Sequence, residues 1–152
     1  MKPKIAEVET YLDQLEFGEY VPHENDCDVQ ASTARHHLET VHPDWVTGIS
    51  IMYGLTFALE FVGHGILVVK CKEGDFYYDC TTQDGKDTRR HRGIGWRNMW
   101  WKYLTMGFFI LYHYDEWGDY TPSAFWRRRH HMTPWFLFGR LFDKVQHKTF
   151  II

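Results

Sequence analysis

Three side chains have the chemistry of a cysteine nucleophile with its base and its orienting group: Cys27, His64 and Asp79. Cys27 stands where a helix is expected to begin, and the free amides and macrodipole of a helix N-terminus favour the thiolate, the reactive form of cysteine. His64 lies between Gly63 and Gly65 before an apolar run, and Asp79 ends the next such run. A cysteine nucleophile needs a base within hydrogen-bond reach, and the base needs an orienting group. These residue types predict nucleophilic catalysis by a cysteine thiolate.

The hairpin expected between residues 66–72 and 76–80 decides whether His64 and Asp79 can meet. A turn at Glu73-Gly74 sets His64 opposite Gln83, so that Asp79, four residues away, points to the same face of the hairpin. This register separates His64 from Asp79 by about 13 Å, at about 3.3 Å per residue. A bulge, a shifted turn or a strong twist must therefore close the gap.

The elements that would position these residues follow from hydrophobic periodicity. Helices are expected over residues 4–17 and from about Cys27 to Pro43, where apolar or small residues recur three or four positions apart. Strands are expected over residues 45–53, 55–62, 66–72 and 76–80, which are rich in β-branched and aromatic residues. A loop over 81–92, a short helix over 97–102, a strand over 107–114 and helices over 122–129 and 134–145 follow. This order predicts an α+β fold, in one domain over residues 1–152.

The chain resembles the transglutaminase-like cysteine peptidases of the papain-like and transglutaminase superfamily. The resemblance covers about residues 20–83 and rests on three motifs, NDCD at 25–28, GHGILVV at 63–69 and GDFYYD at 74–79. The separations of 37 residues from Cys27 to His64 and 15 from His64 to Asp79 are similar to those of that family. The resemblance implies a papain-like core over residues 20–83, completed by the aromatic, basic residues 84–152. It also implies a Cys27–His64–Asp79 triad that hydrolyses or transfers an amide bond of a protein or peptide.

The resemblance extends to two further features. The backbone N–H of Cys27 is a natural oxyanion donor, and Tyr20 is placed like the tyrosine that peptidoglycan-cleaving relatives use as a second donor. Some bacterial relatives bind calcium through acidic residues beside the cysteine, and here Asp26 and Asp28 flank Cys27. Calcium takes six to eight oxygen ligands, so two carboxylates alone do not make the site. No other metal or cofactor is expected.

The charges of the chain divide between its two halves and suggest a competing, non-enzymatic function. Residues 1–80 hold 5 Lys/Arg and 14 Asp/Glu, whereas residues 81–152 hold 12 Lys/Arg and 6 Asp/Glu. Arginines beside tryptophans, as at 96–97 and 126–129, are typical of surfaces that bind single-stranded nucleic acid or a nucleotide. The alternative to the enzyme is therefore a protein that binds nucleic acid, a nucleotide or another protein through its second half. Attraction between the two oppositely charged halves would also explain the division.

Composition bears on the compartment in which the protein works. The longest apolar run, at 107–112, is far shorter than the roughly 20 residues of a membrane span, and the first residues lack the apolar core of a signal peptide. Three cysteines without a CxxC spacing indicate neither a disulfide framework nor a zinc knuckle. We therefore expect a cytoplasmic protein with reduced thiols that does not associate with membranes.

Overall fold

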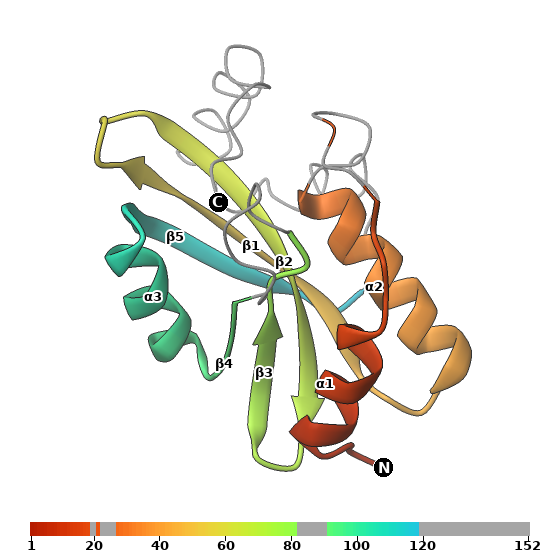
Figure 1. The fold of residues 1–152 in the computed structure, drawn as a ribbon. Helices are drawn as coiled ribbons and strands as arrows, with labels where there is room; N and C mark the ends of the chain where they lie inside the picture. Colours follow the sequence, from red (N-terminus) through yellow and green to blue (C-terminus); the bar gives the residue numbers. More distant parts are fainter. Residues whose placement is uncertain (19–20, 22–26, 82–90, 119–152) are drawn as a thin grey trace.

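One antiparallel sheet organises the part of the chain that the computed structural model describes, residues 1–18, 21, 27–81 and 91–118 (Figure 1). Its strands are β1 (Thr47–Thr56), β2 (Phe61–Cys71), β3 (Gly74–Tyr78), β4 (Arg92–Ile94) and β5 (Phe108–Glu116). They lie in the order β4-β3-β2-β1-β5, and every neighbouring pair is antiparallel. The helices of the same ranges are α1 (Ile5–Asp13), α2 (Cys27–Val41) and α3 (Trp96–Thr105). The predicted α+β class is confirmed.

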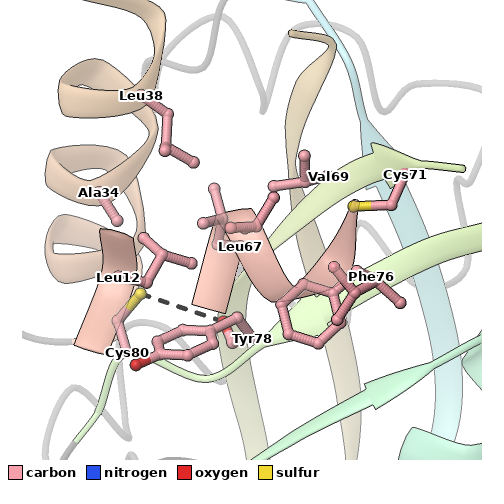
Figure 2. Close-up of a cluster of buried hydrophobic side chains, with 11 residues drawn as sticks. Leu12, Ala34, Leu38, Leu67, Val69, Cys71, Phe76, Tyr78 and Cys80 are labelled. Carbon is pink, nitrogen blue, oxygen red and sulfur yellow. Dashed lines mark hydrogen bonds between the residues drawn. The ribbon is translucent and has the colours of Figure 1, made fainter. Parts of the chain in front are cut away.

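Helices cover both faces of the sheet (Figure 1). Side chains alternate between the two faces along each strand, so each face presents apolar side chains that a helix can bury. On one face, α1 and α2 pack on β2 and β3 through a cluster that includes Leu12, Ala34, Leu38, Leu67, Val69, Phe76 and Tyr78 (Figure 2). On the other face, α3 packs through Met99 and Tyr103 on Met52, Ile66, Val68 and Tyr77. His64 and Asp79 belong to the α3 face, because His64 pairs with Met52 and Asp79 follows Tyr77 by two residues.

Hydrogen bonds and ion pairs join α1 to the hairpin of β2 and β3 and to β4. The backbone N–H of Ile5 donates to the Glu73 carboxylate at 3.1 Å, at the turn of the hairpin. The Arg92 guanidinium bridges Glu9 at 3.1 Å and Asp13 at 2.7 Å, and the Tyr78 hydroxyl also donates to Asp13, at 2.7 Å. Arg92 thus joins the basic half of the sequence to the acidic half, as the division of charge suggested.

Where the sequence indicated four strands between residues 45 and 80, the structure has three. β1 and β2 each run through a predicted interruption, and Gly63 and Gly65 pair with Tyr53 and Ile51 as ordinary members of the ladder. Gly63 lies beneath an aromatic ring, since a Cβ there would come within 2.7 Å of Tyr53 Cε1. The glycines around His64 therefore make room for neighbouring side chains instead of ending a strand.

The second half of the chain is partly described and completes the sheet. The short strand β4 lies at the end of the predicted loop over 81–92 and pairs with β3, and sequence analysis missed it. The helix and strand expected over 97–102 and 107–114 are confirmed as α3 and β5. The helices expected over 122–129 and 134–145 lie outside the described residues. Within the ranges that the structure describes, no helix is long and apolar enough to span a membrane.

Candidate active site

A buried hydrogen-bonded pair of His64 and Asp79 forms the centre of the site. His64 lies in β2, Asp79 follows the last residue of β3, and the two residues are 2% and 1% exposed. The Nε2 atom of His64 lies 2.8 Å from Oδ2 of Asp79. The structure therefore brings together the predicted base and the predicted orienting group.

The register of the hairpin explains how the two side chains meet, and it corrects the predicted turn. Cys71 pairs with Gly74, so the turn is Lys72-Glu73 and not Glu73-Gly74. Gly74 adopts a φ of 137°, which glycine tolerates far better than other residues. Each β2 residue therefore lies opposite a partner two positions earlier than expected. If that register is continued past β3, Asp79 falls only two residues from the position opposite His64, and the predicted gap of about 13 Å is wrong.

The Asp79 carboxylate has three hydrogen-bond donors, of which sequence analysis predicted only His64. The Thr81 backbone N–H donates to Oδ1 at 2.9 Å, and the Tyr103 hydroxyl donates to Oδ2 at 2.7 Å. Burial alone would raise the pKa of Asp79, but the charge of His64 and the hydrogen bonds from His64, Thr81 and Tyr103 together lower it. The carboxylate is therefore ionised at neutral pH and can hold an imidazole ring in one orientation.

Tyr103 lies in α3, in the second half of the chain, where the prediction of secondary structure from the sequence is weakest. Burial, the charge of Asp79 and the hydrogen bond to it raise the pKa of Tyr103 well above its usual value, so the hydroxyl remains a donor. Its partner on the helix, Met99, is also fully buried. The signal that could have found Tyr103 is this i, i+4 pair, because a buried phenol on a helix usually has a hydrogen-bond partner. The predicted helix ended at residue 102 and left Tyr103 out.

Cys27 begins α2, as predicted, and is 1% exposed. The start of α2 lies against β2 at Gly65, because a Cβ there would lie only 3.2 Å from Asp28 Cβ and 3.4 Å from Asp28 Cα. Gly65 points to the face of the sheet that α2 covers, whereas the neighbouring His64 side chain points to the α3 face. After burial and the two effects of Asp79, a negative charge on Cys27 also raises the pKa of Tyr103. The charge of a Cys27 thiolate would therefore act on Tyr103, the residue that donates to Asp79.

The second ring nitrogen of His64, Nδ1, could accept a proton. Nδ1 is buried and has no hydrogen-bond partner among the described residues. Because Nε2 is engaged by a carboxylate acceptor, the tautomer with the proton on Nε2 is favoured, and Nδ1 then carries a lone pair. A buried polar atom without a partner costs free energy, and such an atom at a candidate site is consistent with a role in catalysis.

The other residues of the sequence hypothesis are only partly described. Tyr20 and Asp26 lie outside the described residues, and Asp28 lies in the first turn of α2. In the described ranges, no group of three or more His, Cys, Asp or Glu side chains could hold a metal ion. The calcium hypothesis therefore rests on the sequence resemblance alone.

A second polar cluster lies on the same face of the sheet and was not anticipated. Nε2 of His113 contacts both Ser50 Oγ at 2.7 Å and Asp115 Oδ1 at 2.6 Å, and the Tyr77 hydroxyl donates to Asp115 Oδ2 at 2.7 Å. The Trp96 ring stacks on His113. A serine nucleophile needs the histidine to face it with one nitrogen and the carboxylate with the other. Here one nitrogen serves both and Ser50 is fully buried, so the cluster does not have the geometry of a serine hydrolase.

The described tryptophans of the basic half are mostly engaged within the protein. Trp96 stacks on His113, and Trp100 donates its indole N–H to the Ile110 carbonyl at 3.1 Å. Trp101 is 58% exposed. The arginines at 127–129 lie outside the described residues. Trp101 meets Trp100 edge to face at 5.1 Å, and Trp100 meets Phe109, which is 41% exposed, at 5.7 Å. These three rings are the described aromatic group that the nucleic-acid alternative could use.

Comparison with known proteins does not place the chain in a family. It matches no protein-family model, no curated protein and no solved structure. A function for the site must therefore be argued from its side chains.

The carboxylates of Asp79, which is buried, and Asp115, which is partly buried, predict how stability depends on pH. Burial alone would raise the pKa of Asp115, but hydrogen bonds from His113, Tyr77 and Ser50 and the charge of His113 together lower it. The pKa of Asp79 is also lowered from its usual value. A carboxyl whose folded pKa lies below its unfolded value of about 3.9 stabilises the protein above that value. We expect this stability to be lost as the pH falls from about 5 through the folded pKa values.

Urea unfolding of the wild type and of Asp115→Asn at pH 6 and pH 3 would test this expectation. The loss of unfolding free energy between the two pH values should be smaller in the variant, which lacks one of the two groups. An equal loss in both proteins would contradict the role of Asp115.

Proposed function

We propose that the protein is a cysteine-dependent hydrolase or acyl transferase that acts on an amide bond of a protein or peptide. Cys27 is the nucleophile, His64 the base and acid, and Asp79 the orienting group of a papain-like, transglutaminase-like core. The observation that carries the proposal is the buried His64–Asp79 hydrogen bond of 2.8 Å, which leaves Nδ1 of His64 without a partner among the described residues. Histidine and carboxylate pairs of this kind orient a base toward a nucleophile.

The proposed reaction begins with transfer of the Cys27 thiol proton to Nδ1 of His64. The start of α2 favours the thiolate, and the imidazolium is stabilised by Asp79. The sulfur forms a bond to the carbonyl carbon of the amide, and the resulting oxyanion accepts a hydrogen bond from the Cys27 backbone N–H. Tyr20 is the proposed second donor.

The second half of the reaction regenerates the thiol. The carbon–nitrogen bond breaks, the leaving amine takes the proton from His64, and a thioester remains on Cys27. Water then attacks the thioester, gives its proton to His64 and releases a carboxylic acid, after which the proton returns to sulfur. An amine in place of water yields a new amide, so one site supports hydrolysis and transfer.

The experiment that tests the proposal measures the rate of Cys27 alkylation against pH. A small reagent such as iodoacetamide suits the buried site, and mass spectrometry of peptides identifies the modified cysteine. We expect Cys27 to react well below pH 8 in the wild type and to lose that reactivity in His64→Ala, because the imidazolium no longer stabilises the thiolate. Cys71 provides an internal reference, because burial and the charges of Glu73, Asp75 and Glu7 raise its pKa to about 12.

A matched control is His113→Ala. This variant removes a histidine that is also paired with a carboxylate on the same face of the sheet, and it should leave the Cys27 profile unchanged. Wild-type and His64→Ala profiles that both follow an ordinary thiol would overturn the triad and favour a binding protein.

A further inference from the structure

We propose that Tyr103 is a positioning residue of the site, which fixes the Asp79 carboxylate and limits how strongly that carboxylate holds His64. The inference deepens the proposed function and rests on it. Its basis is that Tyr103 and His64 share one acceptor atom: the Tyr103 hydroxyl lies 2.7 Å from Asp79 Oδ2, and His64 Nε2 lies 2.8 Å from the same oxygen. Neither distance leaves room for a bridging group.

Sharing the oxygen has a chemical consequence. Two donors on one oxygen divide its negative charge, so each hydrogen bond is weaker than it would be alone. The remaining oxygen, Oδ1, is held by the Thr81 backbone N–H at 2.9 Å. The carboxylate is thereby prevented from rotating, and its basicity toward His64 is set by a hydroxyl that stays protonated.

The surroundings of Tyr103 keep the hydroxyl in place. Its ring meets the His64 ring edge to face, with centroids 5.7 Å apart, and contacts Phe108 in the same way at 6.1 Å. One turn earlier, Met99 packs on Gly93 of β4, where a Cβ would lie 3.1 Å from its sulfur. Tyr103 therefore touches both members of the His64–Asp79 pair from a helix that contacts both β4 and β5.

The test observes the proton on Nε2 of His64 by NMR, in protein labelled with ¹⁵N at histidine. We expect its ¹H resonance to move downfield in Tyr103→Phe, because Asp79 Oδ2 then accepts from His64 alone and that bond strengthens. The resonance is assigned by its loss in His64→Gln. Replacing Tyr103 with 3-fluorotyrosine, a stronger donor of nearly the same shape, should move the signal in the opposite direction.

The matched control is Tyr77→Phe. Tyr77 donates to Asp115 Oδ2 at 2.7 Å. The Tyr77→Phe variant therefore removes an equivalent hydroxyl from the other histidine–carboxylate pair, and it should leave the His64 signal unchanged. A purely structural role of Tyr103 would lower stability without moving the resonance. An unmoved resonance in folded Tyr103→Phe would overturn the inference.

If the Phe variant does not fold, the direction of the shift in the fluorotyrosine protein decides in its place. The result also separates the inference from the proposed function. The resonance reports on His64 and Asp79 whether or not Cys27 is a nucleophile, whereas the alkylation profile of the wild type decides the function.

Discussion

Replacing Asp79 with alanine should lower the free energy of unfolding by about 3 kcal/mol or more. The side chain is 1% exposed and accepts hydrogen bonds from His64, Tyr103 and the Thr81 backbone. Without the carboxylate, each of these donors is left in the interior without its acceptor, which is costly. Urea denaturation at pH 7, followed by circular dichroism, measures the loss.

Asp115→Ala serves as the matched control for this change. Asp115 is paired with His113 in the same way, but 17% of each side chain is exposed, so water can replace part of the lost interactions and the loss should be smaller. A double-mutant cycle of Asp79→Ala with Tyr103→Phe should be strongly non-additive, because the hydroxyl has no acceptor once the carboxylate is gone. Additive losses, or an Asp79→Ala protein as stable as the wild type, would contradict the central position of this carboxylate.

Replacing Gly54 with alanine should destabilise the protein by a similar amount, about 3 kcal/mol. A Cβ at this position would come within 2.0 Å of the Phe109 carbonyl oxygen and within 2.8 Å of Ile110 Cα, both of which are backbone atoms of β5. The register of β1 and β5 shifts between Tyr53 and Gly54, and the absent side chain permits this close approach. Alanine therefore forces β5 away from β1 and strains the ladder that joins the second half of the chain to the sheet.

Gly93→Ala is the matched control for Gly54→Ala. Its nearest neighbour is the flexible side chain of Met99, at 3.1 Å from the added Cβ, so a small movement accommodates the methyl group. Thermal unfolding of both variants measures the difference. Equal midpoints for the two variants would show that β5 tolerates the added methyl group, contrary to the expected backbone clash.

The sequence predicted the face on which His64 and Asp79 lie better than their position along it. Side-chain parity depends only on the twofold repeat of a strand, so a shift of two residues preserves the face. The turn itself depends on which residue adopts a positive φ, and Gly74 fits either of two turns, at 72–73 or 73–74. The structure selects the turn that brings Asp79 two residues closer to His64.

Other features depend on contacts that no local pattern contains. The beginning of α2 at Cys27 was predictable from the apolar stripe that follows it. The hydrogen bond from Tyr103 to Asp79, however, joins residues 24 positions apart, through a helix whose aromatic sequence shows no clear period. Likewise, Gly63 and Gly65 read as strand breakers until Tyr53 and Asp28 are seen to occupy the space beside them. Long-range packing decided each of these points.

The attachment of α1 has a consequence for the order in which the protein folds. The helix precedes its polar partners in the chain by a wide margin, because Glu73, Tyr78 and Arg92 lie 65 to 83 residues after the α1 residues that they contact. Closing such long loops costs entropy before any contact is gained. On the ribosome, α1 is therefore made well before the residues that hold it, and its ion pairs with Arg92 form only after β4 has emerged from the exit tunnel.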